Sequence, residues 1–190
     1  MKTPTARLPA RLAGWSEMET KKELPNRKPL RLRDFDYSIP GAYFITVCTH
    51  NKKPTLSHIV GAIHESPAIK LTAYGEIADK MINNIPARFA VVVDQYVIMP
   101  NHIHLILAIA DDSQTRAIRE SPLQSRSVIS KIVGYLKMNV SKEIHQQGDK
   151  IPVWQRGFHD HVIRNRQDYE EHVKYICENP IKWQFDPLYT

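Results

Sequence analysis

The sequence predicts an α+β fold in which an antiparallel sheet carries helices packed on one face, of the ferredoxin-like split βαβ kind. From residue 43 onward, strand-like and helix-like segments follow in the order strand, helix, strand, strand, helix, strand, helix. That order is typical of this topology. The two central strand-like segments, 91–99 and 102–110, are separated only by a Pro-Asn turn signal, which indicates a hairpin.

The first half of the fold is expected to contain one strand and one helix. Residues 43–50 are rich in β-branched and aromatic side chains, which favour a strand. Residues 55–70 have an ambiguous pattern that leaves room for a short strand near 59–63. Residues 71–89 repeat apolar side chains at helical spacing and are predicted to form a helix.

The second half is expected to contain a long helix, a short strand and a final helix. Residues 111–125 are polar and charged, as is typical of a loop. Residues 122–147 are predicted to be helical because apolar side chains recur every four positions from 128 to 144. A short strand is expected at 159–164 and a helix at 167–177.

The positive charge of the chain is concentrated at its beginning. The formal net charge is +6, and residues 1–33 hold nine lysines and arginines against three glutamates. We therefore expect a basic, mostly irregular arm over residues 1–40 and a single domain over residues 41–190. A basic arm on a neutral body is a common way to bind phosphate backbones; a solvated leader is the alternative.

The composition argues against membrane and secreted classes. No run of about 18 apolar residues is present, so no membrane span is expected. The first residues lack the apolar core of a secretory signal. Two cysteines without metal-type spacing do not form a disulfide framework, so a reduced cytoplasmic location is expected.

His102 and His104 are candidate metal ligands. Residues two apart on a strand point to the same face, so both imidazoles would project together while Ile103 points into the core. Neutral imidazole is a common metal ligand, and two histidines are too few for a closed structural zinc site. The alternative interpretation is a pair of surface histidines.

The long helix offers a candidate nucleophile and a third ligand. Tyr135 and Asn139 are four residues apart, at the edge of the apolar arc, so they share one helix face. If this edge lies near the histidines, the amide oxygen of Asn139 completes a three-ligand site and the Tyr135 phenol reaches a metal-bound phosphate. Lys131 and Lys142 lie close enough along the helix to help activate the phenol. The alternative is a boundary tyrosine beside a solvated asparagine.

Four blocks of the sequence resemble the single-tyrosine HUH transposases of insertion sequences, in the branch called REP-associated tyrosine transposases. Residues 96–107 resemble the block with the paired histidines, and residues 132–139 resemble a tyrosine helix. Residues 153–165 and 175–183 resemble the third block and the ending of that branch. The order of the blocks from about Arg31 to the C-terminus makes the resemblance specific.

The resemblance implies a mechanism and a cofactor. It implies a metal-dependent endonuclease and strand transferase that cuts single-stranded DNA beside a hairpin through a 5′-phosphotyrosine. Magnesium or manganese would be the ion, His102 and His104 its paired ligands, Asn139 the third ligand and Tyr135 the nucleophile. Relatives often place Gln at the third position, so Asn139 departs from the pattern.

Several further residues are candidate DNA contacts. Trp154 is a candidate for base stacking, although a core position is the alternative. Arg156 and Arg164 are candidates for phosphates or a guanine edge. His159 and His161 form a second His-x-His pair that we do not assign to the metal. The full set of candidate DNA-binding residues is Arg31, Arg33, Lys131, Lys142, Trp154, Arg156 and Arg164.

The expected partner is single-stranded or hairpin DNA, in the bacterial cytoplasm and nucleoid. No membrane partner is expected, and both a monomer and a homodimer fit the sequence. Two other functions remain open. One is a catalytically silent protein that binds hairpin DNA, and the other is a replication-initiator-type nickase with the same chemistry.

Overall fold

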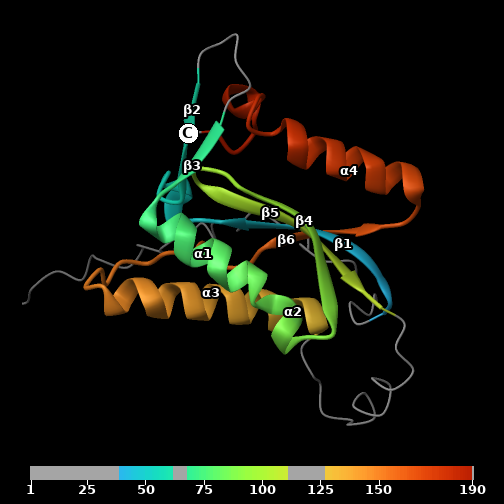
Figure 1. Cartoon of the computed structure of the whole chain (residues 1–190), viewed down its shortest axis with the longest axis horizontal. Helices are drawn as coiled ribbons and strands as arrows, with labels where there is room; N and C mark the ends of the chain where they lie inside the picture. Colours follow the sequence, from blue (N-terminus) through green and yellow to red (C-terminus); the bar gives the residue numbers. More distant parts are fainter. Residues whose placement is uncertain (1–38, 62–67, 111–126, 190) are drawn as a thin grey trace, which may run out of the picture.

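The computed structural model describes residues 39–61, 68–110 and 127–189. The strands are β1 (Gly41–Cys48), β2 (Ser57–Val60), β3 (Ala68–Leu71), β4 (Val91–Ile98), β5 (His102–Ile109) and β6 (His159–Ile163). The helices are α1 (Ala73–Asn83), α2 (Ile85–Arg88), α3 (Val128–Gln146) and α4 (Arg166–Glu178), with 3-10 turns η1 (His50–Lys52) and η3 (Trp183–Phe185). Figure 1 shows how these elements form layers.

The central sheet has the predicted topology. Its four strands lie in the order β4-β5-β1-β6, and every neighbouring pair is antiparallel. Strands and helices alternate as β1, α1, β4, β5, α3, β6 along the chain, which is the split βαβ arrangement. The ambiguous region at 55–70 contributes a separate antiparallel hairpin, β2-β3. The α+β prediction with an antiparallel sheet is confirmed.

The two faces of the sheet are covered by different helices. Odd-numbered residues of β5, such as Ile103 and Leu105, pack into the main core with the apolar residues of α1 and α3. Even-numbered Ile106 belongs to a second cluster with Ile176 of α4. Figure 1 shows α4 on the opposite side of the sheet from α1 and α3. The expectation that helices cover one face therefore applies to α1, α2 and α3, and α4 departs from it.

Local signals explain where the helices begin and end. Thr72, Ser127 and Asn165 cap the starts of α1, α3 and α4, each by accepting a hydrogen bond from the backbone N–H three residues later. The single helix expected over 71–89 is divided at Asn84 into α1 and α2, because Pro86 has no N–H to continue the helical ladder.

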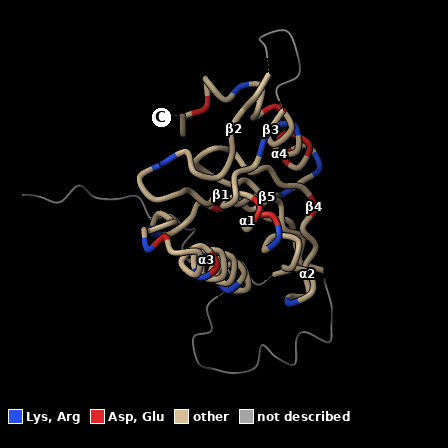
Figure 2. Tube along the Cα trace, turned by 60° about the vertical axis from the view of Figure 1, so that its left-hand side comes forward, with Lys and Arg blue, Asp and Glu red and all other residues tan. Residues whose placement is uncertain are grey.

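Some sequence predictions lie outside the described residues. These include the arm except for its last two residues, with Arg31 and Arg33, and the loop at 111–125. The division into arm and domain therefore stays a prediction. Within the described chain, Figure 2 shows acidic and basic residues interspersed along the trace. None of the described helices is long and apolar enough to cross a membrane.

Gly75 allows α1 to lie against the segment that precedes β2. A Cβ at this position would lie 2.0 Å from the carbonyl oxygen of Leu56, an oxygen that accepts a hydrogen bond from the backbone of Thr72. We expect Gly75→Ala to lower the free energy of unfolding by about 2–3 kcal/mol, measured by urea denaturation. Gly134→Ala in α3 is the matched control. Its Cβ meets nothing within 4 Å, so a gain of up to about 1 kcal/mol is expected. An unchanged midpoint for Gly75→Ala would contradict the close approach.

Candidate active site

His102 and His104 are buried side by side on β5, as strand alternation predicts. Their side chains are 0% and 2% exposed, and their ring centroids lie 4.4 Å apart. Nδ1 of His102 lies 2.8 Å from the Asn101 side-chain oxygen, and Nδ1 of His104 lies 2.8 Å from the Thr46 hydroxyl. These contacts fix both rings, as ligand histidines require. The alternative of two surface histidines is therefore ruled out.

The other ring nitrogens of this pair are buried without a hydrogen-bond partner among the described residues. They are Nε2 of His102 and Nε2 of His104. Leaving such a polar atom unpaired costs roughly 1–3 kcal/mol unless something else binds it. Burial, together with the charge of Lys52, lowers the pKa of His102 to about 4 despite the opposing effect of Asp186. Burial, His102 and His172 also lower the pKa of His104. Both rings are therefore neutral near pH 7, the form that binds metals.

Two oxygen donors from the C-terminal part of the chain complete the site. A ligand atom of Asp186 lies within 4.8 Å of ligand atoms of both His102 and His104. The Asn179 side-chain amide, at the C-terminal end of α4, donates to Asp186 Oδ2 at 2.8 Å. Its own oxygen, Oδ1, is buried without a hydrogen-bond partner in the described chain. Two imidazoles and a carboxylate therefore lie together, and the Asn179 amide adjoins that carboxylate.

A tyrosine adjoins this group. The Tyr175 hydroxyl donates a hydrogen bond to Asp186 Oδ2 at 3.1 Å, and its ring packs edge-on against His104 at 5.1 Å. Tyr175 lies one turn before Asn179 on α4, so both side chains point to the same face. Tyr175 is 40% exposed. Burial and Asp186 raise the pKa of the phenol to about 12.

Comparison with known proteins finds relatives of this chain in sequence and in structure. No family model matches the sequence. A Haemophilus influenzae protein without an assigned function is 33% identical over 176 residues, covering 87% of this chain and 94% of that protein. A second Haemophilus influenzae protein, provisionally named a REP-associated tyrosine transposase, is 25% identical and covers 77% of this chain and 74% of its own length.

A solved structure matches the fold. It is a REP-associated tyrosine transposase bound to a REP hairpin, with a TM-score of 0.56 and 24% identity, covering 82% of this chain and 75% of that one. This chain is similar to the REP-associated tyrosine transposases in sequence and in fold. The resemblance of its sequence blocks to that family is thereby confirmed.

The structure does not bring Tyr135 or Asn139 to the histidines. Both lie on α3, which packs on the opposite face of the sheet with Ile103. The Tyr135 ring packs edge-on against Phe89 at 5.6 Å and lies under the Arg88 guanidinium. The Asn139 amide donates to the Tyr135 carbonyl. The expected proximity is wrong because the sheet separates the two sets.

The predicted DNA contacts are distributed over both faces. Lys131 and Lys142 are exposed on α3, away from the histidines. Trp154 is half-buried against the main core, and its indole N–H donates to the Lys137 carbonyl, so the core alternative describes it better than a free stacking platform. Arg156 and Arg164 are exposed, as a phosphate contact requires.

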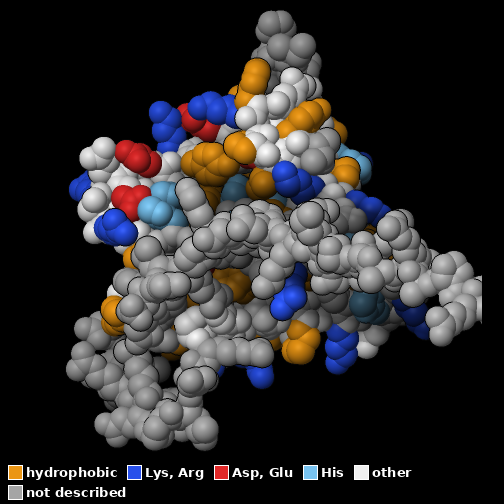
Figure 3. Space-filling view, turned by 180° about the vertical axis from the view of Figure 1, so that it is seen from behind, with side chains coloured by type: hydrophobic (Ala, Val, Ile, Leu, Met, Phe, Trp, Pro, Cys, Tyr) orange, Lys and Arg blue, Asp and Glu red, His pale blue; other side chains and the backbone are white. Residues whose placement is uncertain are grey.

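A pocket of about 500 Å³ opens beside the Tyr175 ring. Its wall on the sheet includes His104, Thr46 and Phe44, and its other walls come from α4 and from the segment at 186–188. Because His159 opposes Thr46 in the β1–β6 register, the second His-x-His pair begins at this pocket. Figure 3, seen from behind, shows histidine and hydrophobic side chains next to one another on the face turned away from the view of Figure 1.

Proposed function

We propose that this transposase cuts single-stranded DNA beside a hairpin by metal-dependent attack of a tyrosine, and that Tyr175 rather than Tyr135 is the nucleophile. One observation carries the proposal. Nε2 of His102, Nε2 of His104 and Oδ1 of Asn179 are buried without hydrogen-bond partners among the described residues, around the carboxylate that binds the Tyr175 hydroxyl.

These donors fit a divalent ion. The two neutral imidazoles and the Asp186 carboxylate give three donors whose ligand atoms lie within 4.8 Å of one another, and the Asn179 amide oxygen would be a fourth. The oxygen donors suit Mg²⁺ or Mn²⁺, which keep positions open for water and phosphate. A bound ion neutralises charge on the phosphate oxygens and orients the scissile bond.

The residues around this ion would have separate roles in the reaction. The Tyr175 oxygen would attack the phosphorus in line, so that a bond forms to the phenol and the bond to the 3′ oxygen breaks. The products are a 5′-phosphotyrosine and a 3′-hydroxyl. A 3′-hydroxyl of a second strand can then displace the tyrosine, which is strand transfer. Asp186 would hold the phenol through the observed hydrogen bond and is placed to receive its proton.

The placement of Tyr175 bears on whether cleavage occurs within one subunit. Its hydroxyl bonds to Asp186 of the same chain, beside the histidines of that chain. We therefore infer that the tyrosine acts in its own subunit.

Lys52 adds a cation close enough to His102 to lower the pKa of that imidazole, and the exposed Arg156 adds another candidate phosphate contact.

A nicking assay tests the proposal. The full chain is incubated with a labelled hairpin oligonucleotide that carries a single-stranded flank, with Mn²⁺ or with a chelator. A metal-dependent covalent adduct, mapped to Tyr175 by mass spectrometry, is expected. Hairpin binding that ignores added metal, with no adduct, would overturn the proposal and favour a silent DNA-binding protein. Nicking restricted to a replication origin would favour the initiator-type alternative.

Asp186 gives a separate prediction. Its carboxylate both approaches the two histidines and holds the Asn179 amide. We expect Asp186→Asn to weaken Mn²⁺ binding about 10–100-fold, measured by isothermal titration calorimetry, because the oxygen donors lose charge and orientation. Glu178→Gln, one residue from Asn179 on a solvent-facing pair with Lys182, is the control. If Asp186→Asn and the native chain bind Mn²⁺ with equal affinity, Asp186 does not contribute to the metal site.

A further inference from the structure

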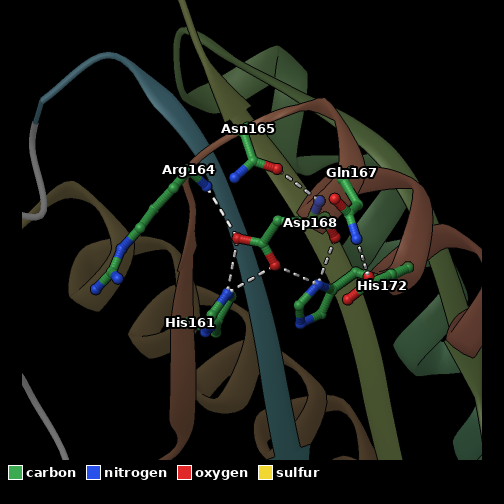
Figure 4. A network of polar contacts seen from close by, with 7 residues as sticks. His161, Arg164, Asn165, Gln167, Asp168 and His172 are labelled. Carbon is green, nitrogen blue, oxygen red and sulfur yellow. Dashed lines mark hydrogen bonds and ion pairs between the residues drawn. The ribbon is translucent and has the colours of Figure 1, made fainter.

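A second group of potential metal ligands lies between β6 and the first half of α4. Figure 4 shows His161 of β6 and His172 of α4 pointing at the carboxylate of Asp168. One atom from each of these three side chains lies within 4.8 Å of the others. Their elements are held together locally, because Asn165 caps α4 and the Arg164 backbone N–H donates to Asp168 Oδ2.

The distances within this group match the spacing of metal ligands. Asp168 Oδ1 lies 3.0 Å from Nε2 of His161 and 3.1 Å from Nδ1 of His172. Ligands at about 2.1 Å from a tetrahedral ion lie about 3.4 Å apart, so a small outward movement of these side chains would admit an ion. The two imidazole rings are stacked, with centroids 4.6 Å apart and an interplanar angle of 21°.

We propose that His161, Asp168 and His172 form a second metal site, for a transition-metal ion of the zinc class. Two imidazoles and one carboxylate are a donor set that zinc accepts readily. Magnesium, by contrast, prefers oxygen ligands and gives up its water reluctantly. Three protein ligands leave one position for water, which the exposure of His161 permits: its side chain is 46% exposed.

This site is distinct from the histidine pair on β5 and adjoins it. The Phe44 ring lies between them, with its centroid 5.0 Å from that of His104 and 4.6 Å from that of His172. His172 also lines the pocket beside Tyr175, which lies one turn further along α4. An ion here would link the edge strand β6 to the helix that carries the proposed nucleophile, and so stiffen one wall of the pocket.

A hydrogen-bond network without an ion is the competing interpretation of the same contacts. In that case the Asp168 carboxylate accepts a hydrogen bond from His161 Nε2, the Asp168 backbone carbonyl accepts one from His172 Nδ1, and these bonds only anchor the start of α4. The two interpretations differ in zinc stoichiometry. They do not differ in whether the chain folds, because the contacts of the main core lie across the sheet.

Equilibrium dialysis of the full chain against Zn²⁺ at neutral pH tests the second site. Two Zn²⁺ per chain are expected, with one lost in His161→Gln and the other lost in the double variant His102→Gln/His104→Gln. His145→Gln, an exposed histidine on α3, is the matched control and should keep both. If His161→Gln binds as many Zn²⁺ ions per chain as the native protein, the proposal is overturned. It is also overturned if the native chain binds a single Zn²⁺ that is lost only in the double variant.

Thermal unfolding provides a second measurement that does not depend on DNA cleavage. In the double variant, Zn²⁺ at about 100 times its Kd should raise the Tm by about 5 °C or more if the second site binds it. Adding His161→Gln should remove that rise; a rise that persists would overturn the assignment. Nicking by the native chain in Mg²⁺ without Zn²⁺ tests the proposed nuclease by itself, so failure of the zinc site is distinguishable from failure of the proposed nuclease.

Discussion

Tyr175→Phe is expected to abolish formation of the covalent DNA adduct, whereas Tyr135→Phe is expected to leave it intact. The substitution removes only the hydroxyl that bonds to Asp186 and keeps the ring that packs against His104. Loss of a nucleophile without loss of the surrounding site reduces the rate by at least about 1,000-fold. The measurement is the rate of adduct formation with a labelled hairpin substrate in Mn²⁺.

Tyr135→Phe is a matched control because it makes the same chemical change on the other side of the sheet. The Tyr135 ring packs against Phe89 and the main core, and Phe preserves that packing. Hairpin affinity should be similar in both variants, which separates chemistry from binding. An adduct that persists in Tyr175→Phe and disappears in Tyr135→Phe would restore the assignment made from the sequence.

Strand alternation was sufficient to predict that His102 and His104 share one face of the sheet, but placing Tyr135 also required the face on which α3 packs. If Ile103 points into the core, then His102 and His104 point to the other face. A long helix whose apolar arc covers the core face lies beside Ile103 and cannot reach the histidines. Helical periodicity gives the direction of the apolar arc but not the face of the sheet against which it packs.

The spacing that pointed to α3 occurs again on α4. Tyr135 precedes Asn139 by four residues, and Tyr175 precedes Asn179 by the same number. The second pair lies in the block that resembles the ending of the family, so a search for every Tyr-x₃-Asn pair would have produced both candidates. Deciding between them requires the tertiary packing that places α4 over the histidines.

Asp186 could not be found by periodicity. It follows the 3-10 turn η3, where neither helix nor strand spacing determines which way a side chain points. Its orientation comes from individual hydrogen bonds, which the Asn179 amide and the Leu188 backbone N–H donate to its carboxylate. Trp154 is a second example. The sequence left open a base-stacking role and a core role for this side chain, and its contacts in the folded chain favour the core role.

The double variant His102→Gln/His104→Gln is expected to abolish metal-dependent nicking and the stabilisation of the chain by Mn²⁺. An ion that binds only the folded state raises the stability of that state in proportion to the logarithm of the ion concentration divided by Kd. Loss of the two histidines should therefore remove the rise in Tm that Mn²⁺ causes. We expect Mn²⁺ affinity to fall by at least about 100-fold.

Chelation of the native chain should stop nicking but leave the fold intact. The main core lies between the sheet and helices α1 and α3, and the two histidines contribute nothing to it. Circular dichroism with and without chelator checks this, and His145→Gln controls for loss of a histidine from the surface. If the double variant still nicks DNA and still gains stability from Mn²⁺, the ion lies elsewhere. Because His102 and His104 are buried and their Nε2 atoms lack partners among the described residues, the ion is what would make these buried imidazoles favourable.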